Sequence, residues 1–237
     1  MSRATLRVAT WNVHDLKDDV AAAVRVVRAV DPDVLCLQEV PRRPFSGRRV
    51  AGFAQRCGLT FAGRHRGSGG TTVLTRPSLD LHDSRHEGLP VAPLQRERGY
   101  AVAQVALPGH RPLTVASIHL GLDPVEREQH VRQVLSDVGP SEALVVAGDL
   151  NELSTGRAWS LLQARLPQVS PERPTFSSRH PRMVIDAVFA SLPMVPDDRA
   201  PVLDPADLVR ASDHLPVWAD LDVSRLARAA RAPVRPG

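Results

Sequence analysis

The sequence predicts an α/β fold in which one domain is built on two β-sheets, with helices on the outside. Strand-like and helix-like segments alternate along the chain, and the strand-like segments are numerous and evenly spread. A strand, a helix and a second strand lie within 40 residues, which is typical of a βαβ-like opening. No linker, internal repeat or low-complexity block interrupts the pattern, so we expect a single domain over residues 1–223 and a basic tail over residues 224–237.

The opening unit follows from hydrophobic periodicity. The run TLRVATWNV over Thr5–Val13 predicts the first strand. Valines and alanines at helical spacing predict a helix over Asp18–Val30, with two acids near its positive end, and Pro32 stops it. The apolar run DVLCLQEV over Asp33–Val40 predicts a second strand that is buried on both faces and ends in Gln38-Glu39.

The middle of the chain predicts a short helix and four strands. An arginine-rich loop, PRRPFSGRR, precedes a short helix that runs through Cys57. The segments LTFAGRHR and GGTTVLTRP predict two paired strands around the glycines of residues 67–70. The segments GYAVAQVAL and RPLTVASIHLG predict two more strands, joined by the turn PGH.

The last third of the chain continues the alternation. A helix is predicted over Asp123–Val138, with Asp123 as N-cap and Pro124 in the first turn. A buried strand, EALVVAGDLN, and a short helix, TGRAWSLLQARL, follow it. Met183–Ser191 and His214–Val223 predict the final strands, and the basic end SRLARAARAPVRPG predicts a fraying helix or a loose tail.

Composition narrows the class of protein. The start of the chain lacks the apolar region of a secretory signal and no run is long enough to span a bilayer, so we expect a cytoplasmic protein without stable membrane insertion. Two cysteines are too few for a disulfide framework or a cysteine-based zinc site.

The formal charge is +4 and arginine carries nearly all of the positive charge, which weakly favours an anionic ligand. Aromatic residues make up 4%, which argues against a base-stacking platform. No obligate protein partner is evident.

Polar side chains stand at the ends of six predicted strands or strand edges. They are Asn12, Glu39, His119, Asp149 with Asn151, Asp186, and Asp213 with His214. Turns explain Asp and Asn at such places, because these side chains bond nearby backbone, but they explain Glu39 and His119 poorly. Asn12 and Asn151 are also the only asparagines of the chain, which indicates that these carboxamides are needed where they stand.

Convergence of these strand ends predicts a cation site. Carboxylate oxygens such as those of Glu39, completed by water and substrate, suit Mg²⁺ or Mn²⁺. Zinc is less favoured, because the sequence has no HExxH motif and no cysteine cluster. Several acids held together without a metal would repel one another and raise their pKa values, and a divalent cation resolves that conflict.

Six segments carry a resemblance to a known family. They are TWNVHD, LQEV, SIHLG, GDLNE, VIDAVFAS and SDHLPV, and GGTTVLTRP and ERGYAVAQV also match. In these segments, in this order over residues 5–217, the sequence resembles the endonuclease/exonuclease/phosphatase superfamily of metal-dependent phosphoesterases. The resemblance implies a DNase I-like, four-layered α/β sandwich, in which two β-sheets pack face to face between helices. It places the motif residues at one edge of the sandwich.

The resemblance also implies roles around the metal. Glu39 would be the principal metal ligand, with Asn12 beside it, and Asp213 would support the metal or the water. Asp149 would orient or deprotonate the attacking water. Mg²⁺ is the implied cofactor, with Mn²⁺ as a substitute. His14 departs from the pattern, because some DNA-repair members carry an acid at this place.

The remaining roles implied by the resemblance concern the phosphate. Asn151 and His119 would hold the phosphate or the developing charge, and Arg98 matches an arginine that the family often places nearby. His214 would donate to a non-bridging phosphate oxygen, with Asp186 orienting and charging its ring. General chemistry supports these roles independently of the resemblance. A carboxylate partner raises the pKa of an imidazole, and phosphoryl transfer depends mainly on positioning and charge neutralisation.

Three functions stay open at this point. The first is a Mg²⁺-dependent phosphoesterase that hydrolyses a phosphodiester by direct attack of water, with nucleic acid favoured by the basic charge and the arginine-rich loop. The second is a hydrolase of a small phosphate ester, such as an inositol phosphate or a lipid head group. The third is a non-catalytic binding module, against which the intact set of site residues argues.

Other conspicuous residues have simpler interpretations. We expect surface or loop positions for the remaining histidines, which are His14, His65, His82, His86, His110, His130 and His180. Trp11 and Trp218 are expected in the core. The arginines of the loop after Glu39, namely Arg42, Arg43, Arg48 and Arg49, form either a solvated loop or the rim of an anion site.

Overall fold

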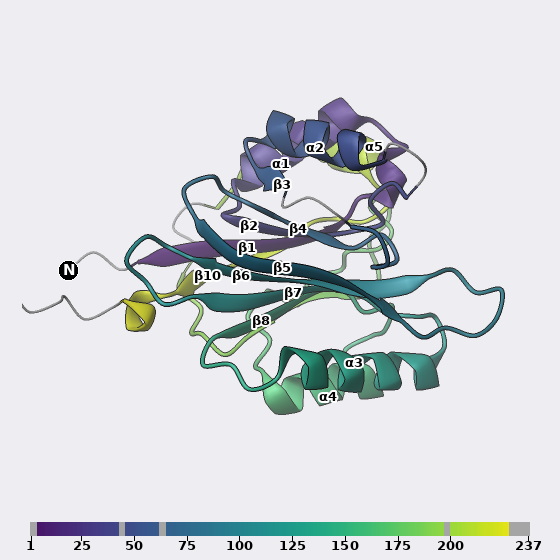
Figure 1. The fold of residues 1–237 in the computed structure, drawn as a ribbon. Coiled ribbons are helices and arrows are strands. Elements are labelled where there is room, and N and C mark those ends of the chain that lie inside the picture. Colours follow the sequence, from purple (N-terminus) through teal and green to yellow (C-terminus); the bar gives the residue numbers. More distant parts are fainter. Residues whose placement is uncertain (1–3, 43–45, 62–64, 197–199, 228–237) are drawn as a thin grey trace, which may run out of the picture.

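The computed structural model describes residues 4–42, 46–61, 65–196 and 200–227 (Figure 1). Its described strands form two sheets of five strands each. The first sheet has the order β10–β1–β2–β4–β3. Its strands are β1 (Thr5–Asn12), β2 (Val34–Gln38), β3 (Thr60–Phe61), β4 (Thr72–Thr75) and β10 (Val217–Asp222). Within the described part of this sheet, β1 and β2 are the parallel pair and the other paired strands run antiparallel.

The second sheet has the order β5–β6–β7–β8–β9. Its strands are β5 (Asp80–Leu89), β6 (Arg98–Ala106), β7 (Leu113–His119), β8 (Leu144–Asp149) and β9 (Asp186–Ala190). Here β7 and β8 are the parallel pair, in a register that places His119 opposite Asp149. The ends of these two strands therefore present their side chains together.

The sheets pack face to face, and helices cover both outer faces (Figure 1). The first sheet is covered by α1 (Val20–Val30), α2 (Ser46–Cys57) and α5 (Pro205–Ala211). The second sheet is covered by α3 (Pro124–Val138) and α4 (Arg157–Arg165). Two short 3₁₀ helices, η1 (His14–Leu16) and η2 (Ser224–Leu226), complete the described elements. The predicted four-layered sandwich is confirmed.

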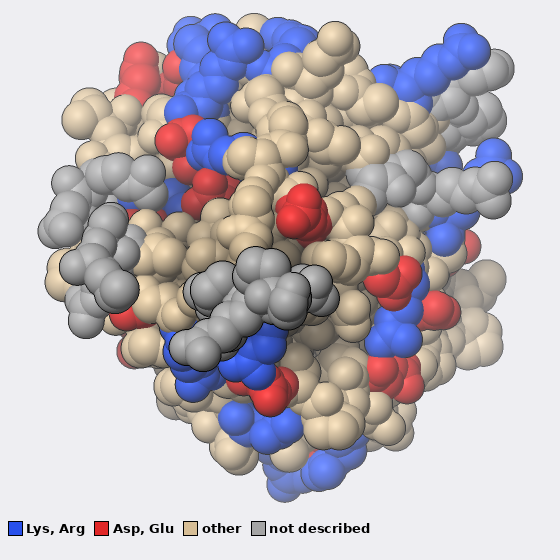
Figure 2. Space-filling model, turned by 60° about the vertical axis from the view of Figure 1, so that its left-hand side comes forward, with Lys and Arg blue, Asp and Glu red and all other residues tan. Residues whose placement is uncertain are grey.

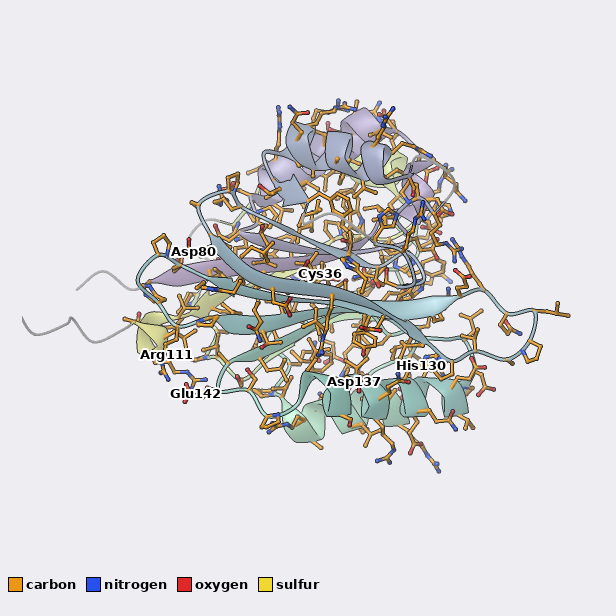
Figure 3. The ribbon with its side chains drawn as sticks, viewed as in Figure 1. Cys36, Asp80, Arg111, His130, Asp137 and Glu142 are labelled. Atoms are coloured by element: carbon orange, nitrogen blue, oxygen red, sulfur yellow. The ribbon has the colours of Figure 1, made fainter. Side chains whose placement is uncertain are left out.

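The central core lies between the two sheets. Val8, Cys36, Val115 and Val145 are among the buried residues that meet there, and Figure 3 labels Cys36 in this layer. Burial raises the pKa of the Cys36 thiol to about 12, so the thiol stays protonated. Trp11 packs on the opposite face of β1, in the core under α1 and α2. Apolar residues on both faces of β1 explain its continuous hydrophobic run.

Helix α3 begins as the sequence predicts, because the side chain of Asp123 accepts from its first two backbone amides and Pro124 lies in the first turn. Helix α1 begins at Val20, two residues later than predicted, and the side chain of Asp19 accepts from the backbone amides of Ala21 and Ala22. No helix in the described part of the chain is both long and apolar enough to cross a membrane.

Some expectations are wrong. Two elements have no counterpart in the prediction, namely β5, whose residues are mostly exposed and polar, and α5, which has seven residues. His130, expected at the surface or in a loop, lies on α3 and is fully buried, and His65 is buried too. Each is held by a backbone carbonyl, which satisfies a ring nitrogen inside the protein. Trp218 is only partly buried.

Part of three expectations lies outside the described residues. The predicted strand LTFAGRHR includes residues 62–64, which the structure does not describe, and its described part contains β3. Arg43 of the arginine-rich loop is one of the residues that the structure does not describe. The predicted tail, 224–237, is described only to residue 227, and this piece contains η2.

Candidate active site

Four strand ends, two from each sheet, meet at one edge of the sandwich. Asn12 ends β1 and Glu39 follows β2 in the first sheet, while His119 and Asp149 end β7 and β8 in the second. Asn12 Nδ2 donates a hydrogen bond of 3.0 Å to Asp149 Oδ2. This bond joins the two sheets at the site. The starts of β7 and β8, marked by Arg111 and Glu142 in Figure 3, lie at the opposite edge.

A pocket of about 300 Å³ opens at this edge. Eight of the nine predicted site residues line it, namely Asn12, Glu39, Arg98, His119, Asp149, Asn151, Asp213 and His214. The ninth, Asp186, begins β9 and lies buried behind His214. The pocket wall also includes Arg96, Leu122 and Phe176, which the sequence analysis did not single out.

The imidazole of His214 is held from several sides. Its Nδ1 donates to Asp186 Oδ2 at 2.9 Å, and the hydroxyl of Thr175 donates to the same oxygen at 2.6 Å. Trp11 Nε1 donates to the main-chain oxygen of His214 at 2.8 Å. The ring of Phe176 packs on the imidazole, with centroids 4.9 Å apart. These contacts fix the ring and direct Nε2 into the pocket.

His214 carries a positive charge at neutral pH. Burial alone lowers the pKa of this imidazole, but the charge and hydrogen bond of Asp186, with the charges of Asp149 and Asp213, outweigh burial and raise it to about 10. Asp186 is therefore the main stabiliser of the imidazolium. A fixed cation that is 5% exposed can stabilise an anion strongly, because little water screens it.

Asp149 is the central acid of the pocket. It is 1% exposed, and its Oδ2 lies 3.5 Å from His119 Nε2 and 3.7 Å from His214 Nε2. Its Oδ1 accepts a hydrogen bond of 2.9 Å from the backbone amide of Asn151. Burial, and then the charge of Asp186, raise the pKa of Asp149 to about 6. A carboxylate with a pKa near neutrality is suited to accept a proton from water.

His119 has the opposite electrostatic character to His214. Burial, with the nearby charges of Arg98 and His214, lowers the pKa of His119 well below its ordinary value. The ring is therefore neutral. Its Nε2 faces Asp149 and, at 4.0 Å, Glu39 Oε1, while Nδ1 has no hydrogen-bond partner among the described residues. Two histidines in one pocket thus differ in charge because only one of them has a buried carboxylate as a direct partner.

Arg98 supplies a second buried cation. Its side chain is 7% exposed and lines the pocket, and its Nη1 finds no hydrogen-bond partner within the described residues. The start of β6 is fixed by close backbone packing, because a Cβ on Gly99 would lie 2.4 Å from the Ser68 backbone and one on Gly69 would lie 2.5 Å from that of Arg98. A buried guanidinium with an unpaired donor indicates an anion site.

Glu39 and Asn151 adopt a backbone conformation that is uncommon for residues with side chains. Their φ angles are +50° and +49°, in the left-handed region. Such residues cluster at functional sites, where the surrounding structure maintains the strain. Arg96 lies across the Glu39 carboxylate, with Nη1 at 3.2 Å from each oxygen, and its Nη2 donates to Asp15 at 2.9 Å. No sequence motif pointed to Arg96, because its contacts join segments far apart in the chain.

The donors around Glu39 fit a divalent cation. Glu39 and Asp213 line the pocket with carboxylates, and Asn12 lines it with a carboxamide whose Oδ1 accepts from the backbone amide of His14 at 3.1 Å. Carboxylate and carboxamide oxygens are ligands that Mg²⁺ prefers. The guanidinium across Glu39 shows that this carboxylate accepts a cation. Asp149, Asp186 and His214 also offer ligand atoms within 4.8 Å of one another. We favour the Glu39 set, because Nδ1 of His214 is bonded to Asp186 and the ring is protonated.

Comparison with known proteins agrees with this geometry. The model of the endonuclease/exonuclease/phosphatase family matches residues 9–214. No match was found among curated proteins. An endonuclease/exonuclease/phosphatase from Beutenbergia cavernae has a similar solved structure, with 23% identity, a TM-score of 0.70, and coverage of 94% of this chain and 72% of that one.

Two further solved structures share the fold. A conserved protein of unknown function from Enterococcus faecalis has 18% identity and a TM-score of 0.72, over 90% of this chain and 98% of that one. The human Nocturnin catalytic domain, solved with a bound sulfate anion, has 20% identity and a TM-score of 0.67, over 92% and 94%. With a family model spanning most of the chain and a shared α/β sandwich, this protein belongs to the endonuclease/exonuclease/phosphatase family.

Proposed function

We propose that this protein is a phosphoesterase, dependent on Mg²⁺ or Mn²⁺, that hydrolyses its substrate by direct attack of water. The family supports a hydrolase of phosphoric esters. The observation that carries the proposal is Asp149, a buried acid that faces a protonated His214 and a neutral His119 in one pocket. We propose residues 1–223 as its single domain, with 224–237 as a tail.

The proposed mechanism assigns the water to Asp149. The raised pKa and fixed orientation of its carboxylate suit it to hold the attacking water and accept its proton. Asn12 and the Asn151 amide each bond a different oxygen of this carboxylate, so its plane is set before substrate binds. A hydroxyl or thiol nucleophile is not required.

The proposed phosphate site uses the two cations and the neutral imidazole. His214 Nε2 would donate to a non-bridging oxygen, and Arg98 would neutralise a second one with its unpaired Nη1. His119 and the carboxamide of Asn151 would bond the remaining oxygens. A divalent cation held by Glu39, Asn12 and Asp213 would neutralise phosphate charge and acidify the water.

A matched pair of variants tests this proposal. Asp149→Asn preserves the size of the side chain but removes the base, so turnover with Mg²⁺ should fall by about 10³-fold or more. Asp80→Asn changes an exposed carboxylate at the far end of the second sheet (Figure 3) and should keep full activity. Both should keep the circular dichroism spectrum of the wild type, and Asp80→Asn should also keep its melting temperature. Full activity in Asp149→Asn, or activity that survives a chelator, would contradict the mechanism.

Nucleic acid is our first choice of substrate, because the chain is basic, Arg96 and Arg98 line the pocket, and the charge of Arg42 acts on His119. On the face in Figure 2, acidic and basic side chains are interspersed, so this face offers no uniformly basic surface to a nucleic acid. We therefore expect nucleic acid to bind at the edge of the pocket. If DNA is the substrate, the protein should nick plasmid DNA in a metal-dependent way. Its affinity for DNA should fall steeply as the salt concentration rises.

A small phosphate ester is the second choice. The observation in its favour is the size of the pocket, about 300 Å³, with Leu122 and Phe176 in its wall. Hydrolysis of small mono- or diesters without any nicking of plasmid, and with little salt dependence, would favour this alternative.

A further inference from the structure

Arg96 lies on the loop between β5 and β6. The first residues of this loop are hydrogen-bonded to helix α3. His130 Nε2, on α3, donates to the main-chain oxygen of Pro90 at 2.6 Å, and Glu126 accepts from the backbone amide of Ala92 at 2.8 Å. Leu94 beyond these contacts is fully exposed. The loop projects past the sheets in Figure 1 and carries Arg96 back to the pocket.

The contacts of Arg96 place a guanidinium where the proposed cation would bind. Its Nη1 lies 3.2 Å from both oxygens of Glu39, and its side chain is 39% exposed, compared with 12% for Glu39. The second contact, to Asp15 at 2.9 Å, is to an acid that is 40% exposed. A divalent cation across Glu39 and this guanidinium would need the same space. Exposed pairs of this kind are weak, so a doubly charged ion can displace the arginine.

A displaced Arg96 has another partner within the same pocket. Arg98 lies two residues further along the chain and lines the same pocket, and its Nη1 has no hydrogen-bond partner among the described residues. Arg96 lines the same pocket, and its side chain is flexible and long enough to reach an anion bound there. Two guanidiniums on one wall match the oxygens of a phosphate group, because each can form charge-assisted hydrogen bonds with it.

We propose that Arg96 exchanges partners during binding: the divalent cation displaces it from Glu39, and it then binds the phosphate of the substrate beside Arg98. Arg96 would thus be a specificity-determining residue that binds the phosphate group of the substrate. This inference rests on the proposed function, because it uses the cation site at Glu39.

The experiment compares Arg96→Gln with Arg42→Gln. Arg42 contacts Glu97 at 3.5 Å and its charge acts on His119, so its removal changes the local field without releasing Glu39. Mn²⁺ binding is measured by calorimetry, followed by binding of inorganic phosphate to the Mn²⁺-saturated protein. Arg96→Gln should bind Mn²⁺ about two- to fivefold more tightly, as expected for loss of a weak competing pair. It should also bind phosphate several-fold more weakly, and Arg42→Gln should change both affinities less.

The outcomes separate this inference from the function on which it rests. Glu39→Gln should abolish Mn²⁺ binding, which identifies the site being measured. Unchanged Mn²⁺ affinity in Arg96→Gln, or an equal gain in Arg42→Gln, would overturn the exchange while leaving the phosphoesterase intact. Unchanged phosphate affinity would overturn it as well. A wild type that binds no Mn²⁺ would overturn both the exchange and the proposed metal dependence.

Discussion

Replacing Asp186 with asparagine should convert His214 from a cation into a neutral ring. The change removes the carboxylate charge that lies 2.9 Å from His214 Nδ1, while a side chain of nearly the same size still accepts the Thr175 hydroxyl. Burial then acts on the imidazole with much less opposition. We expect the pKa of His214 to fall from about 10 to below the ordinary imidazole value of about 6.5.

The magnitude follows from that difference. A fall from about 10 to about 6.5 exceeds three pKa units, and each unit corresponds to about 1.4 kcal/mol. Near pH 8 the variant would therefore present a neutral ring to the phosphate. Loss of one preorganised charged donor costs about 10²- to 10³-fold in kcat, so we expect a decrease of that size. The loss should shrink toward about pH 5.5, where the ring of the variant is protonated again.

Two measurements test this chain of reasoning. Nuclear magnetic resonance follows the titration of the His214 ring in the wild type and in Asp186→Asn, and kinetics gives the dependence of kcat on pH for both. Thr175→Val is the control, because it removes a hydrogen bond to Asp186 but leaves the charge, and it should shift the pKa of His214 much less. A His214 that still titrates above about pH 9 in Asp186→Asn, or an unchanged kcat near pH 8, would refute the reasoning.

Two further predictions concern stability. Glu152→Ala should lower the free energy of unfolding by about 3 kcal/mol. The change leaves the buried Arg127 without its carboxylate partner and removes the acceptor of the Trp159 backbone amide in the first turn of α4. Thermal denaturation should show a melting temperature lower by roughly 6–12 °C, and Glu152→Gln should lower it less. His130 should make stability depend on pH. Burial lowers the pKa of its ring, and the backbone amide of Gly121 donates to its Nδ1, so the folded protein keeps the ring neutral. As the pH drops below about 6.5, this histidine takes up a proton in the unfolded chain before it does so in the folded protein, and the free energy of unfolding decreases. In urea denaturation at about pH 7.5 and about pH 5, His130→Gln should lose less stability between the two pH values than the wild type, and an equal loss would contradict this.

The strands that carry the candidate site were predictable because their signal is local. A buried strand is a mainly apolar run. Strands β2 and β8 each show an unbroken one before their polar ends, and β1 and β7 show one that a few polar residues interrupt. Strand β5 has no such signal, since its side chains are mostly exposed and its pairing with β6 comes from backbone hydrogen bonds that any sequence can make. Helix α5 has seven residues, too few for a periodic pattern to stand out.

The parts of the site that were missed depend on contacts between distant segments. Arg96 lies in a loop without a pattern, and only the fold brings it to Glu39, 57 residues away in sequence. His130 looked like a surface histidine because the sequence does not show that two backbone groups bond its ring. Trp11 was expected in the core, but its bond to the backbone of His214 was not foreseeable from residue type.

The two asparagines show how far a single sequence can carry such reasoning. In a chain that otherwise avoids this residue, both hold the same acid: Asn12 donates to Asp149 Oδ2 through its side chain, and Asn151 donates to Oδ1 through its backbone. Asparagine suits position 151 for a further reason, because it tolerates the left-handed φ of +49° better than most residues and its carboxamide bonds the main-chain oxygen of Leu120. Lys17, the only lysine, is exposed and has no comparable set of contacts among the described residues. Rarity alone therefore does not identify a functional residue. At the ends of β1 and β8 it coincides with the convergence of the two sheets, where the side chain of Asn12 and the backbone amide of Asn151 each donate to one oxygen of the same carboxylate.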